Sequence, residues 1–299
     1  MRLLVVGRQG QLACSLAERT KARGITGICV GRPELDLSAP DTIADTLTTI
    51  EADLIINAAA FTAVDKAEQE QELAQIVNAA APSQLAVFAS QRGIPIIQIS
   101  TDYVFDGRAD RPYREDDNVS PLGIYGATKA AGERAVAAIT ENHVILRTGW
   151  IYSPFHSNFV KTMLRLAETR DEISVVCDQI GAPTSALDLA DAIVDLAYNL
   201  IRHPDDATLR GTFHAVAGWS TSWADFARLI FDEAKARGGP YASVRSISTA
   251  DYPTPARRPA YSVLDTARLR LRHGISLPEG RASVAECVAR LVSPEKEKG

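Results

Sequence analysis

Short apolar runs alternate with stretches of helical periodicity, and this alternation limits the possible folds more than any other feature. The runs cover residues 3–6, 27–30, 54–56, 96–99 and 144–146. Between them, apolar residues recur at helical spacing over 12–23, 41–51, 73–91 and 128–139, and Asp41 is expected to cap the second of these helices. Strands that helices cover on both faces are continuously apolar. The sequence therefore predicts an α/β fold with a doubly wound parallel sheet of the Rossmann type.

The pattern loosens after about residue 150, where Pro and Gly become frequent. We predict a dinucleotide-binding domain at 1–150, with a probable return segment at 186–216, and a smaller, interleaved substrate-binding region at 151–299. Helical spacing recurs at 158–168, 186–201, 223–236 and 282–291, and 213–216 is a strand that returns to the main sheet. The charged end at 295–299 is expected to be frayed and solvated.

Composition excludes several classes of partner. The 299 residues carry a formal net charge of -5, with 46% hydrophobic and 23% charged residues and no block of Lys or Arg. These values predict a globular protein that binds neither nucleic acid nor membranes. The apolar run at 3–6 is too short for a signal sequence, so we expect a cytoplasmic protein. Four separated cysteines and five scattered histidines predict no metal site.

A glycine-rich turn follows the first predicted strand. Gly7, Gly10, Gln11 and Leu12 stand where a strand-to-helix turn brings backbone N–H groups to a pyrophosphate. The spacing alone fits an ordinary turn equally well. Arg32, after the second strand, favours the 2′-phosphate of NADPH over NADH, although a surface arginine explains it as well. Small residues after the third run let a cofactor lie flat there: Ala58, Ala59 and Ala60.

Three side chains predict carbonyl reduction. Tyr125 and Lys129 are four residues apart and share a helix face, so the ammonium is expected to lower the pKa of the phenol from about 10 toward neutrality. Thr101 follows the strand at 96–99 and can hydrogen-bond the same carbonyl oxygen. A Tyr-x-x-x-Lys pair also occurs by chance on helix surfaces. Its position at the carboxyl end of the sheet favours catalysis.

Four longer motifs, at 57–68, 100–105, 178–184 and 253–259, carry a resemblance over nearly the whole chain. Together with the glycine-rich turn, Thr101 and Tyr125-x-x-x-Lys129, they resemble the extended short-chain dehydrogenase/reductase superfamily and, within it, the dTDP-4-dehydrorhamnose reductase family. The resemblance implies that NADPH, or NADH, reduces the C4 keto group of dTDP-4-dehydro-L-rhamnose to give dTDP-L-rhamnose, in dTDP-rhamnose and surface polysaccharide biosynthesis. Tyr125 would donate the proton.

The resemblance also implies roles for the other site residues. Lys129 would bind the nicotinamide ribose, Thr101 would polarise the carbonyl, and Asp102 and Trp150 would face the sugar. A tryptophan at such a position is otherwise a core residue. Arg257 and Arg258 would bind the nucleotide diphosphate, whereas a pair of surface arginines is the simpler interpretation. The cofactor would be lined by Gly10, Gln11, Leu12, Asp36, Leu37, Ala60, Phe61 and Thr62.

Three alternative functions remain open. Another nucleotide-sugar 4-reductase or a 4-epimerase would use similar residues, and an epimerase would retain its NAD. A dehydratase is not among them, because it typically needs an Asp-Glu pair after the threonine, whereas here Tyr103 follows Asp102. A non-catalytic NAD(P)-binding regulatory subunit, of the kind that serves methionine adenosyltransferase, would not need the three side chains to converge.

Two departures limit the resemblance. Some members of the family dimerise around magnesium held by acidic side chains, but Ser15 and Leu187 stand where two of those acids align. The sequence therefore does not support magnesium, and we expect a monomer or weak homodimer. Gly149 replaces the usual serine, which is expected to loosen the sugar pocket.

Overall fold

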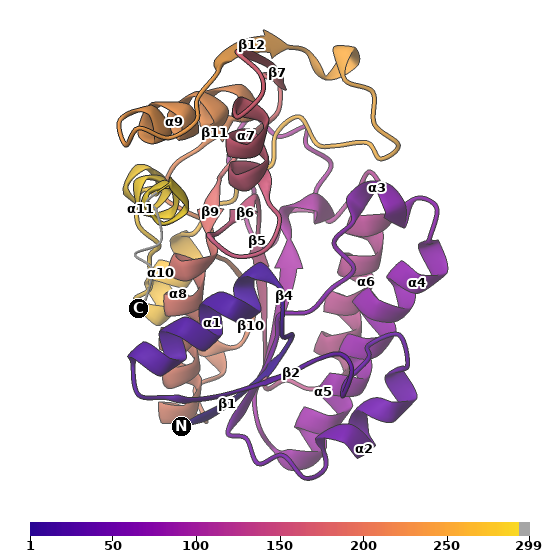
Figure 1. Cartoon of the computed structure of the whole chain (residues 1–299). Helices are drawn as coiled ribbons and strands as arrows, with labels where there is room; N and C mark the ends of the chain where they lie inside the picture. The colour runs from indigo at the N-terminus through magenta and orange to yellow at the C-terminus, as the bar shows by residue number, and fades with distance from the viewer. Residues whose placement is uncertain (293–299) are drawn as a thin grey trace.

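A computed structural model describes residues 1–292 of the chain, so the predicted frayed end at 295–299 lies outside the described residues. Its centre is a six-stranded sheet in the order β10-β5-β4-β3-β1-β2, and every neighbouring pair is parallel (Figure 1). The strands are β1 (Arg2–Val6), β2 (Thr26–Val30), β3 (Leu54–Asn57), β4 (Ile96–Thr101), β5 (His143–Thr148) and β10 (Gly211–His214). The predicted doubly wound parallel α/β sheet is confirmed.

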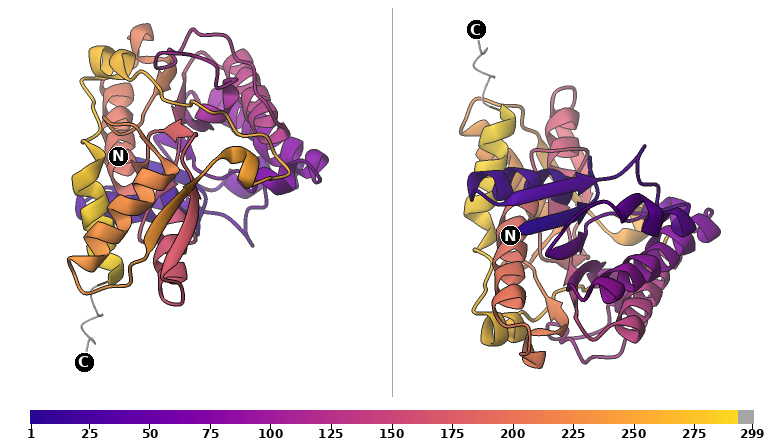
Figure 2. Two further views of the ribbon diagram at one scale, coloured as in Figure 1. Left: turned by 90° about the horizontal axis from the view of Figure 1, so that it is seen from above. Right: turned by 90° about the horizontal axis from the view of Figure 1, so that it is seen from below.

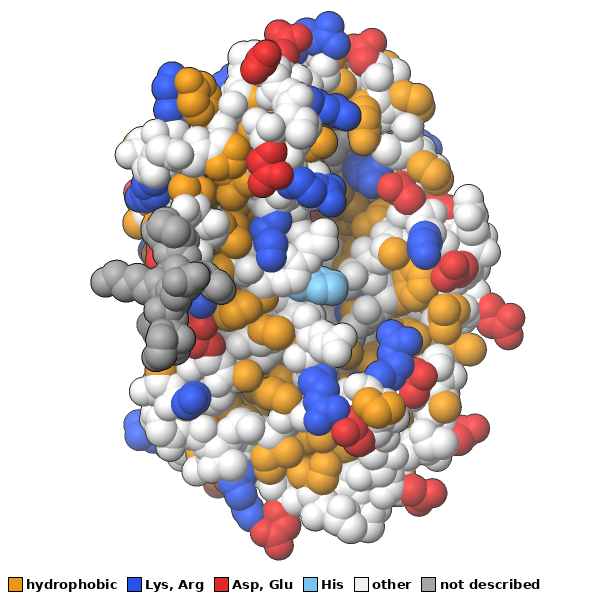
Figure 3. Space-filling model, in the orientation of Figure 1, with side chains coloured by type: hydrophobic (Ala, Val, Ile, Leu, Met, Phe, Trp, Pro, Cys, Tyr) orange, Lys and Arg blue, Asp and Glu red, His pale blue; other side chains and the backbone are white. Residues whose placement is uncertain are grey.

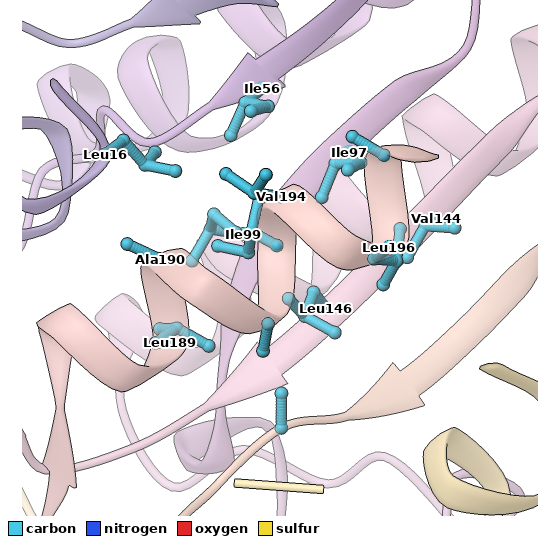
Figure 4. Close-up of a cluster of buried hydrophobic side chains, with 14 of the residues drawn as sticks. Leu16, Ile56, Ile97, Ile99, Val144, Leu146, Leu189, Ala190, Val194 and Leu196 are labelled. Atoms are coloured by element: carbon cyan, nitrogen blue, oxygen red, sulfur yellow. The ribbon is translucent and has the colours of Figure 1, made fainter. Parts of the chain in front are cut away.

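Helices cover both faces of this sheet, which explains why its strands are apolar on both sides. One face packs against α1 (Gln11–Ala22) and α8 (Ala186–Arg202). Figure 4 shows Leu189, Ala190 and Val194 of α8 among Ile97 and Leu146 of the strands. The other face packs against α2 (Ile43–Leu47), α5 (Ala81–Arg92) and α6 (Ile124–Ile139).

Two predicted helices differ from those observed. The segment at 41–51 is a 3₁₀ turn, Pro40–Thr42, followed by the short α2, and Asp41 lies inside the 3₁₀ turn and caps nothing. The segment at 73–91 is divided into α4 (Gln71–Gln75), a π-helical turn (Ile76–Ala80) and α5. Pro82 has no N–H to donate to the carbonyl of Asn78 four residues earlier, which favours the wider turn.

The π-helical turn connects the segment after β3 to α6. The Asn78 amide accepts a hydrogen bond from Phe61 N at 2.8 Å and donates one to Thr128 Oγ1 of α6 at 3.1 Å. It thereby ties the segment after β3 to the helix that carries Tyr125. Gly132 of α6 allows this close approach, because a Cβ there would lie 2.1 Å from Asn78 O.

The chain returns to the main sheet after residue 185. α8 packs against α1, and β10 pairs with β5 in register Phe213↔Leu146. These contacts follow the return segment expected at 186–216, and the exact domain boundaries stay a prediction. Two short strand pairs lie outside the main sheet: β6 (Ile151–Tyr152) with β9 (Thr184–Ser185), and β8 (Ile180–Gly181) with β11 (Thr221–Ser222).

The second region has its own apolar core, around Tyr152, Phe226 and Ile230. It is built from α7 (Phe159–Ala167), β7 (Glu172–Val176), α9 (Trp223–Lys235), β12 (Ser243–Ile247) and α11 (Gly280–Val292), while α3 (Val64–Ala67) and α10 (Ala267–His273) flank the main sheet. From above, α9 and β12 lie in front, and from below β1 and β2 do, so this region lies at the opposite end of the molecule from β1 and β2 (Figure 2). Within residues 1–292, no helix has both the length and the apolar character needed to cross a membrane.

Candidate active site

A cleft with a volume of about 950 Å³ opens at the carboxyl ends of the sheet strands. Open α/β sheets bind ligands at this edge, where the strand order reverses between β1 and β3. Figure 3 shows the face hollowed between its upper and lower halves, with basic side chains and a histidine around the hollow. The following residues expected from the sequence line the cleft: Gly7, Gly10, Gln11, Leu12, Arg32, Asp36, Leu37, Ala58, Ala59, Ala60, Phe61, Thr62, Thr101, Asp102, Tyr125, Lys129 and Trp150.

The glycine-rich turn forms one wall of the cleft. Gly7 has φ +129°, a backbone conformation that favours glycine, and its N–H donates to Val30 O at 2.7 Å. Gly10 is the N-cap of α1 and provides no capping side chain, so the first N–H groups of the helix lack a side-chain partner. Such a helix N-terminus attracts a pyrophosphate through its N–H groups and its dipole. These features fit a dinucleotide.

Two exposed arginines stand at the end of the cleft near β2. Arg32 follows β2 and lines the cleft, and Arg8, in the glycine-rich turn, pairs with Glu34 at 2.5 Å. Asp36 lies beside them, but its carboxylate accepts hydrogen bonds from the backbone and side chain of Ser38 at 2.9 and 2.8 Å. Because Ser38 occupies the Asp36 carboxylate, the side-chain charge that is left to bind a ligand here is positive. A positive charge suits a phosphate better than ribose hydroxyls alone.

Thr101, Tyr125 and Lys129 all line the cleft. Tyr125 lies in the first turn of α6, and Thr101 ends β4 beside Thr148 of β5. Burial raises the pKa of Tyr125 to about 12; a hydrogen bond with Thr101 opposes this shift, and the Asp102 charge adds to it. The phenol therefore holds its proton at neutral pH.

Lys129 is 4% exposed, and its Nζ donates to the backbone carbonyl of Ile99 at 2.6 Å. Burial lowers the pKa of Lys129 to about 8, and the charge of Glu133 opposes this shift. The sequence-based expectation that Lys129 lowers the pKa of Tyr125 differs from the structure. The ammonium is bonded to β4, and the pKa of the phenol is raised because the phenol is withdrawn from water.

Asp102 is a buried carboxyl beside Thr101. It is 2% exposed and accepts a hydrogen bond from Thr101 Oγ1 at 3.0 Å. Burial raises its pKa to about 6, against a hydrogen bond from Ser262. The sequence predicts that Gly149 loosens the sugar pocket, but the structure shows no open space between Gly149 and Asp102. A Cβ on Gly149 would lie only 2.6 Å from Asp102 Cγ, so the carboxylate fills the space that a side chain would need.

Two tryptophans form part of the wall of the cleft. Trp150 has φ +50°, which is uncommon for a bulky residue, and its ring stacks on Trp223 of α9 with 3.5 Å between centroids and 4° between planes. Both indoles line the cleft. Sequence reasoning missed Trp223, because nothing in its local pattern shows that the start of α9 reaches the cleft.

The two arginines expected to bind the diphosphate are placed differently from one another. Arg257 is exposed and lines a small pocket that shares Tyr103 and Tyr125 with the cleft. Arg258 lines neither, and its Nη2 pairs with Asp65 of α3 at 2.8 Å. Its Nη1 is buried without a hydrogen-bond partner. The structure thus gives Arg258 a contact with the protein that the sequence did not predict.

The residues aligned with magnesium ligands lie away from the cleft. Ser15 and Leu187 are buried between α1 and α8, and Ser15 Oγ donates to Gln11 O at 2.9 Å. Over residues 1–292, no group of three or more His, Cys, Asp or Glu side chains is arranged to hold a metal ion.

Comparison with known proteins gives the family. The sequence model of the family described as RmlD substrate binding domain matches residues 1–293. The dTDP-4-dehydrorhamnose reductase of Sinorhizobium fredii (strain NBRC 101917 / NGR234) is 43% identical over 297 residues, which cover 99% of this chain and 100% of that protein.

Two solved structures are similar over the same length. The dTDP-4-dehydrorhamnose reductase of Clostridium acetobutylicum is 38% identical, with a TM-score of 0.88 over 97% of this chain and 99% of that one. The dTDP-4-dehydrorhamnose reductase of Bacillus anthracis, solved in complex with NADP, is 35% identical, with a TM-score of 0.88 over 96% and 98%. The present chain belongs to the RmlD substrate binding domain family.

Proposed function

We propose that this chain is a dTDP-4-dehydrorhamnose reductase, which uses NADPH to convert dTDP-4-dehydro-L-rhamnose to dTDP-L-rhamnose. The reaction belongs to dTDP-rhamnose and surface polysaccharide biosynthesis. The observation that carries the proposal is the convergence of Thr101, Tyr125 and Lys129 in the cleft that the glycine-rich turn opens. Relatives that match this chain over nearly their full length are named dTDP-4-dehydrorhamnose reductase.

The cleft fits a dinucleotide in charge as well as in size. The N-terminus of α1 and Gly7 provide backbone N–H groups for the pyrophosphate, the small residues after β3 leave room for it, and Arg32 would hold the 2′-phosphate of NADPH. Bound there, NADPH supplies a hydride to carbon 4 of the sugar. The other lining residues would hold the cofactor along the strand ends.

Tyr125 is the proton donor. Its raised pKa keeps the phenol protonated. Thr101, whose one hydroxyl proton is donated to Asp102 in this structure, would turn that proton to the same carbonyl oxygen and polarise it. Lys129 provides a buried positive charge for the ribose hydroxyls of the cofactor. Asp102 and Trp150 face the sugar, the stacked Trp150 with an apolar surface that suits a deoxysugar. Arg257 and Arg258 would approach the diphosphate, and for Arg258 this requires a change of partner from Asp65.

The test follows NADPH oxidation with dTDP-4-dehydro-L-rhamnose and identifies the product by NMR. Tyr125→Phe should abolish turnover and keep NADPH binding, because only the hydroxyl is lost. Tyr198→Phe is the matched control. The Tyr198 ring packs against Arg23, on the side of the sheet that α1 and α8 cover. Unchanged turnover in Tyr125→Phe refutes the mechanism.

The same experiment separates the alternatives. A 4-epimerase would be purified with stoichiometric NAD and would not oxidise added NADPH. A non-catalytic regulatory subunit would bind NADPH without turnover of any nucleotide 4-keto sugar in a panel. Either outcome replaces the reductase proposal.

We propose further that the protein works in the cytoplasm as a monomer or weak homodimer, with no nucleic-acid or membrane partner. Its net charge of -5 supports the absence of polyanion binding. Light scattering after size-exclusion chromatography measures the oligomeric state.

A further inference from the structure

A buried ionic cluster lies directly behind Lys129. Glu133 is four residues after Lys129 on α6 and is 7% exposed, and Arg147 of β5 is 4% exposed. Arg147 holds the Glu133 carboxylate with two hydrogen bonds, from Nε to Oε1 at 2.9 Å and from Nη2 to Oε2 at 2.7 Å. Ser100 Oγ, also buried, donates to Oε1. The carboxylate is thus fixed by three hydrogen bonds from two strands.

The arginine of this cluster is itself held in place. Its guanidinium lies over the Phe105 ring, 5.1 Å from the centroid, and its Nη1 donates to Glu115 O at 3.3 Å. His214 Nε2 lies 3.5 Å from the same nitrogen, and burial together with the charge of Arg147 lowers the pKa of His214 to about 3. His214 is therefore neutral and adds no charge.

Ordinary core packing does not require this arrangement. A bidentate arginine on a buried carboxylate costs desolvation of both groups, and apolar residues of similar volume are often as stable. Here the ion pair lies one helical turn from a second buried cation, Lys129. A buried lysine without a nearby anion loses its proton as its pKa falls. The Glu133 charge acts against that loss.

The titratable and charged groups near Lys129 in the fold come from α6 and from two elements that pack against it. Tyr125 and Glu133 lie one turn before and after Lys129 on α6, Asp102 and Tyr103 lie in the 3₁₀ turn after β4, and Arg147 lies on β5. Tyr125 and Tyr103 are neutral because burial raises the pKa of each phenol. With a pKa of about 6, Asp102 loses its proton above that pH, but its side-chain hydrogen-bond partners are Thr101 and Ser262. Glu133 is the fixed carboxylate on the lysine's own helix.

We propose that Glu133 is a positioning residue for the reduction: clamped by Arg147 and Ser100, its carboxylate keeps Lys129 protonated and directed to the carbonyl of Ile99. The inference rests on the proposed function for its catalytic consequence, since Lys129 must be charged to hold the cofactor ribose. Glu133 does not line the cleft and would act through Lys129 alone.

The direct test measures the protonation of Lys129 in the folded protein. The chain has seven lysines, so a ¹³C-lysine NMR spectrum is simple, and Lys129→Met identifies the Cε signal by its loss. Glu133→Gln should lower the pKa of Lys129 by about one unit or more, because it removes the nearby charge and leaves Arg147. Glu141→Gln, at an exposed site beyond the end of α6, is the matched control and should give no shift.

A second variant addresses folding, because Glu133→Gln leaves Arg147 buried without its partner. The double variant Glu133→Gln/Arg147→Met removes both charges and leaves the cluster neutral. The pKa of Lys129 should fall in it as well, but by less than in Glu133→Gln. The basic limb of kcat/KM against pH should move to lower pH by the same amount as the NMR titration. A Lys129 titration unchanged in whichever of these variants folds overturns the proposal.

The two proposals fail in different ways. A native protein that does not oxidise NADPH with the keto sugar refutes the proposed function, while the NMR titration still decides the role of Glu133. A native reductase whose pH profile is identical in the Glu133 variants refutes the positioning role alone.

Discussion

Gly149→Ala tests whether the space beside Asp102 is as full as the structure shows. A methyl group at this position would lie 2.6 Å from Asp102 Cγ and 2.7 and 2.9 Å from its two oxygens. Carbon atoms in ordinary contact are about 3.5–4.0 Å apart, so the carboxylate must move by about 1 Å. That movement breaks the 3.0 Å hydrogen bond from Thr101.

The cost has two parts. Overpacking a full site costs about 1–3 kcal/mol, and the lost hydrogen bond adds about 1 kcal/mol. We expect the free energy of unfolding to fall by about 2–4 kcal/mol, which for a chain of this size lowers Tm by roughly 4–10 °C. Because Thr101 loses its partner, kcat/KM should fall at least tenfold, or about 1.4 kcal/mol of transition-state stabilisation.

The assays are thermal unfolding and NADPH oxidation. Gly218→Ala is the matched control, since its nearest neighbours, Glu279 Cγ and Leu277 O, are both 3.9 Å away. In a double-mutant cycle, Gly149→Ala should cost little once Asp102→Ala has removed the carboxylate, which gives a coupling energy above about 1 kcal/mol. Equal Tm and kcat/KM for Gly149→Ala and the native enzyme would refute the close contact.

Three other changes have defined outcomes. Because the pKa of Asp102 is raised to about 6, the native state binds a proton that the unfolded state releases from about pH 4. The free energy of unfolding should therefore decline between about pH 4 and 6, and Asp102→Asn should remove that dependence in Tm measurements. Arg32→Ala should raise KM for NADPH about tenfold with little change for NADH; equal changes would contradict 2′-phosphate binding. Trp223→Ala should raise KM for the sugar nucleotide as Trp150 loses its stacking partner; an unchanged KM would show that Trp150 does not need this support.

The main sheet could be predicted because its chemistry is local. Strands buried on both faces are apolar at every position, as at Leu3–Val5 and Ile96–Ile97, which are 0% exposed. The break between α4 and α5 could not be predicted in the same way. Pro82 is compatible with the first turn of an ordinary helix, and the π-helical turn depends on the contact of Asn78 with Phe61 and α6.

The site residues also differ in whether the local sequence shows their contacts. Tyr125 and Lys129 are four residues apart, so their pairing is visible as spacing. Glu133 has the same spacing from Lys129, but Arg147, which fixes it, comes from another element and carries no local signal. The stacking of Trp223 on Trp150 is likewise a contact between distant parts of the chain.

Burial is a single cause that shifts the pKa values of the two ionisable residues proposed for catalysis, Tyr125 and Lys129, in opposite directions. It raises the pKa of Tyr125 to about 12 and lowers that of Lys129 to about 8, since in each case the neutral form is favoured. At pH 7 the site therefore holds a protonated phenol beside an ammonium. The phenol gives up its proton once negative charge develops on the carbonyl oxygen, because the alkoxide that would form is a stronger base than the phenolate. The buried Tyr125 therefore stays protonated until hydride transfer creates the need for its proton.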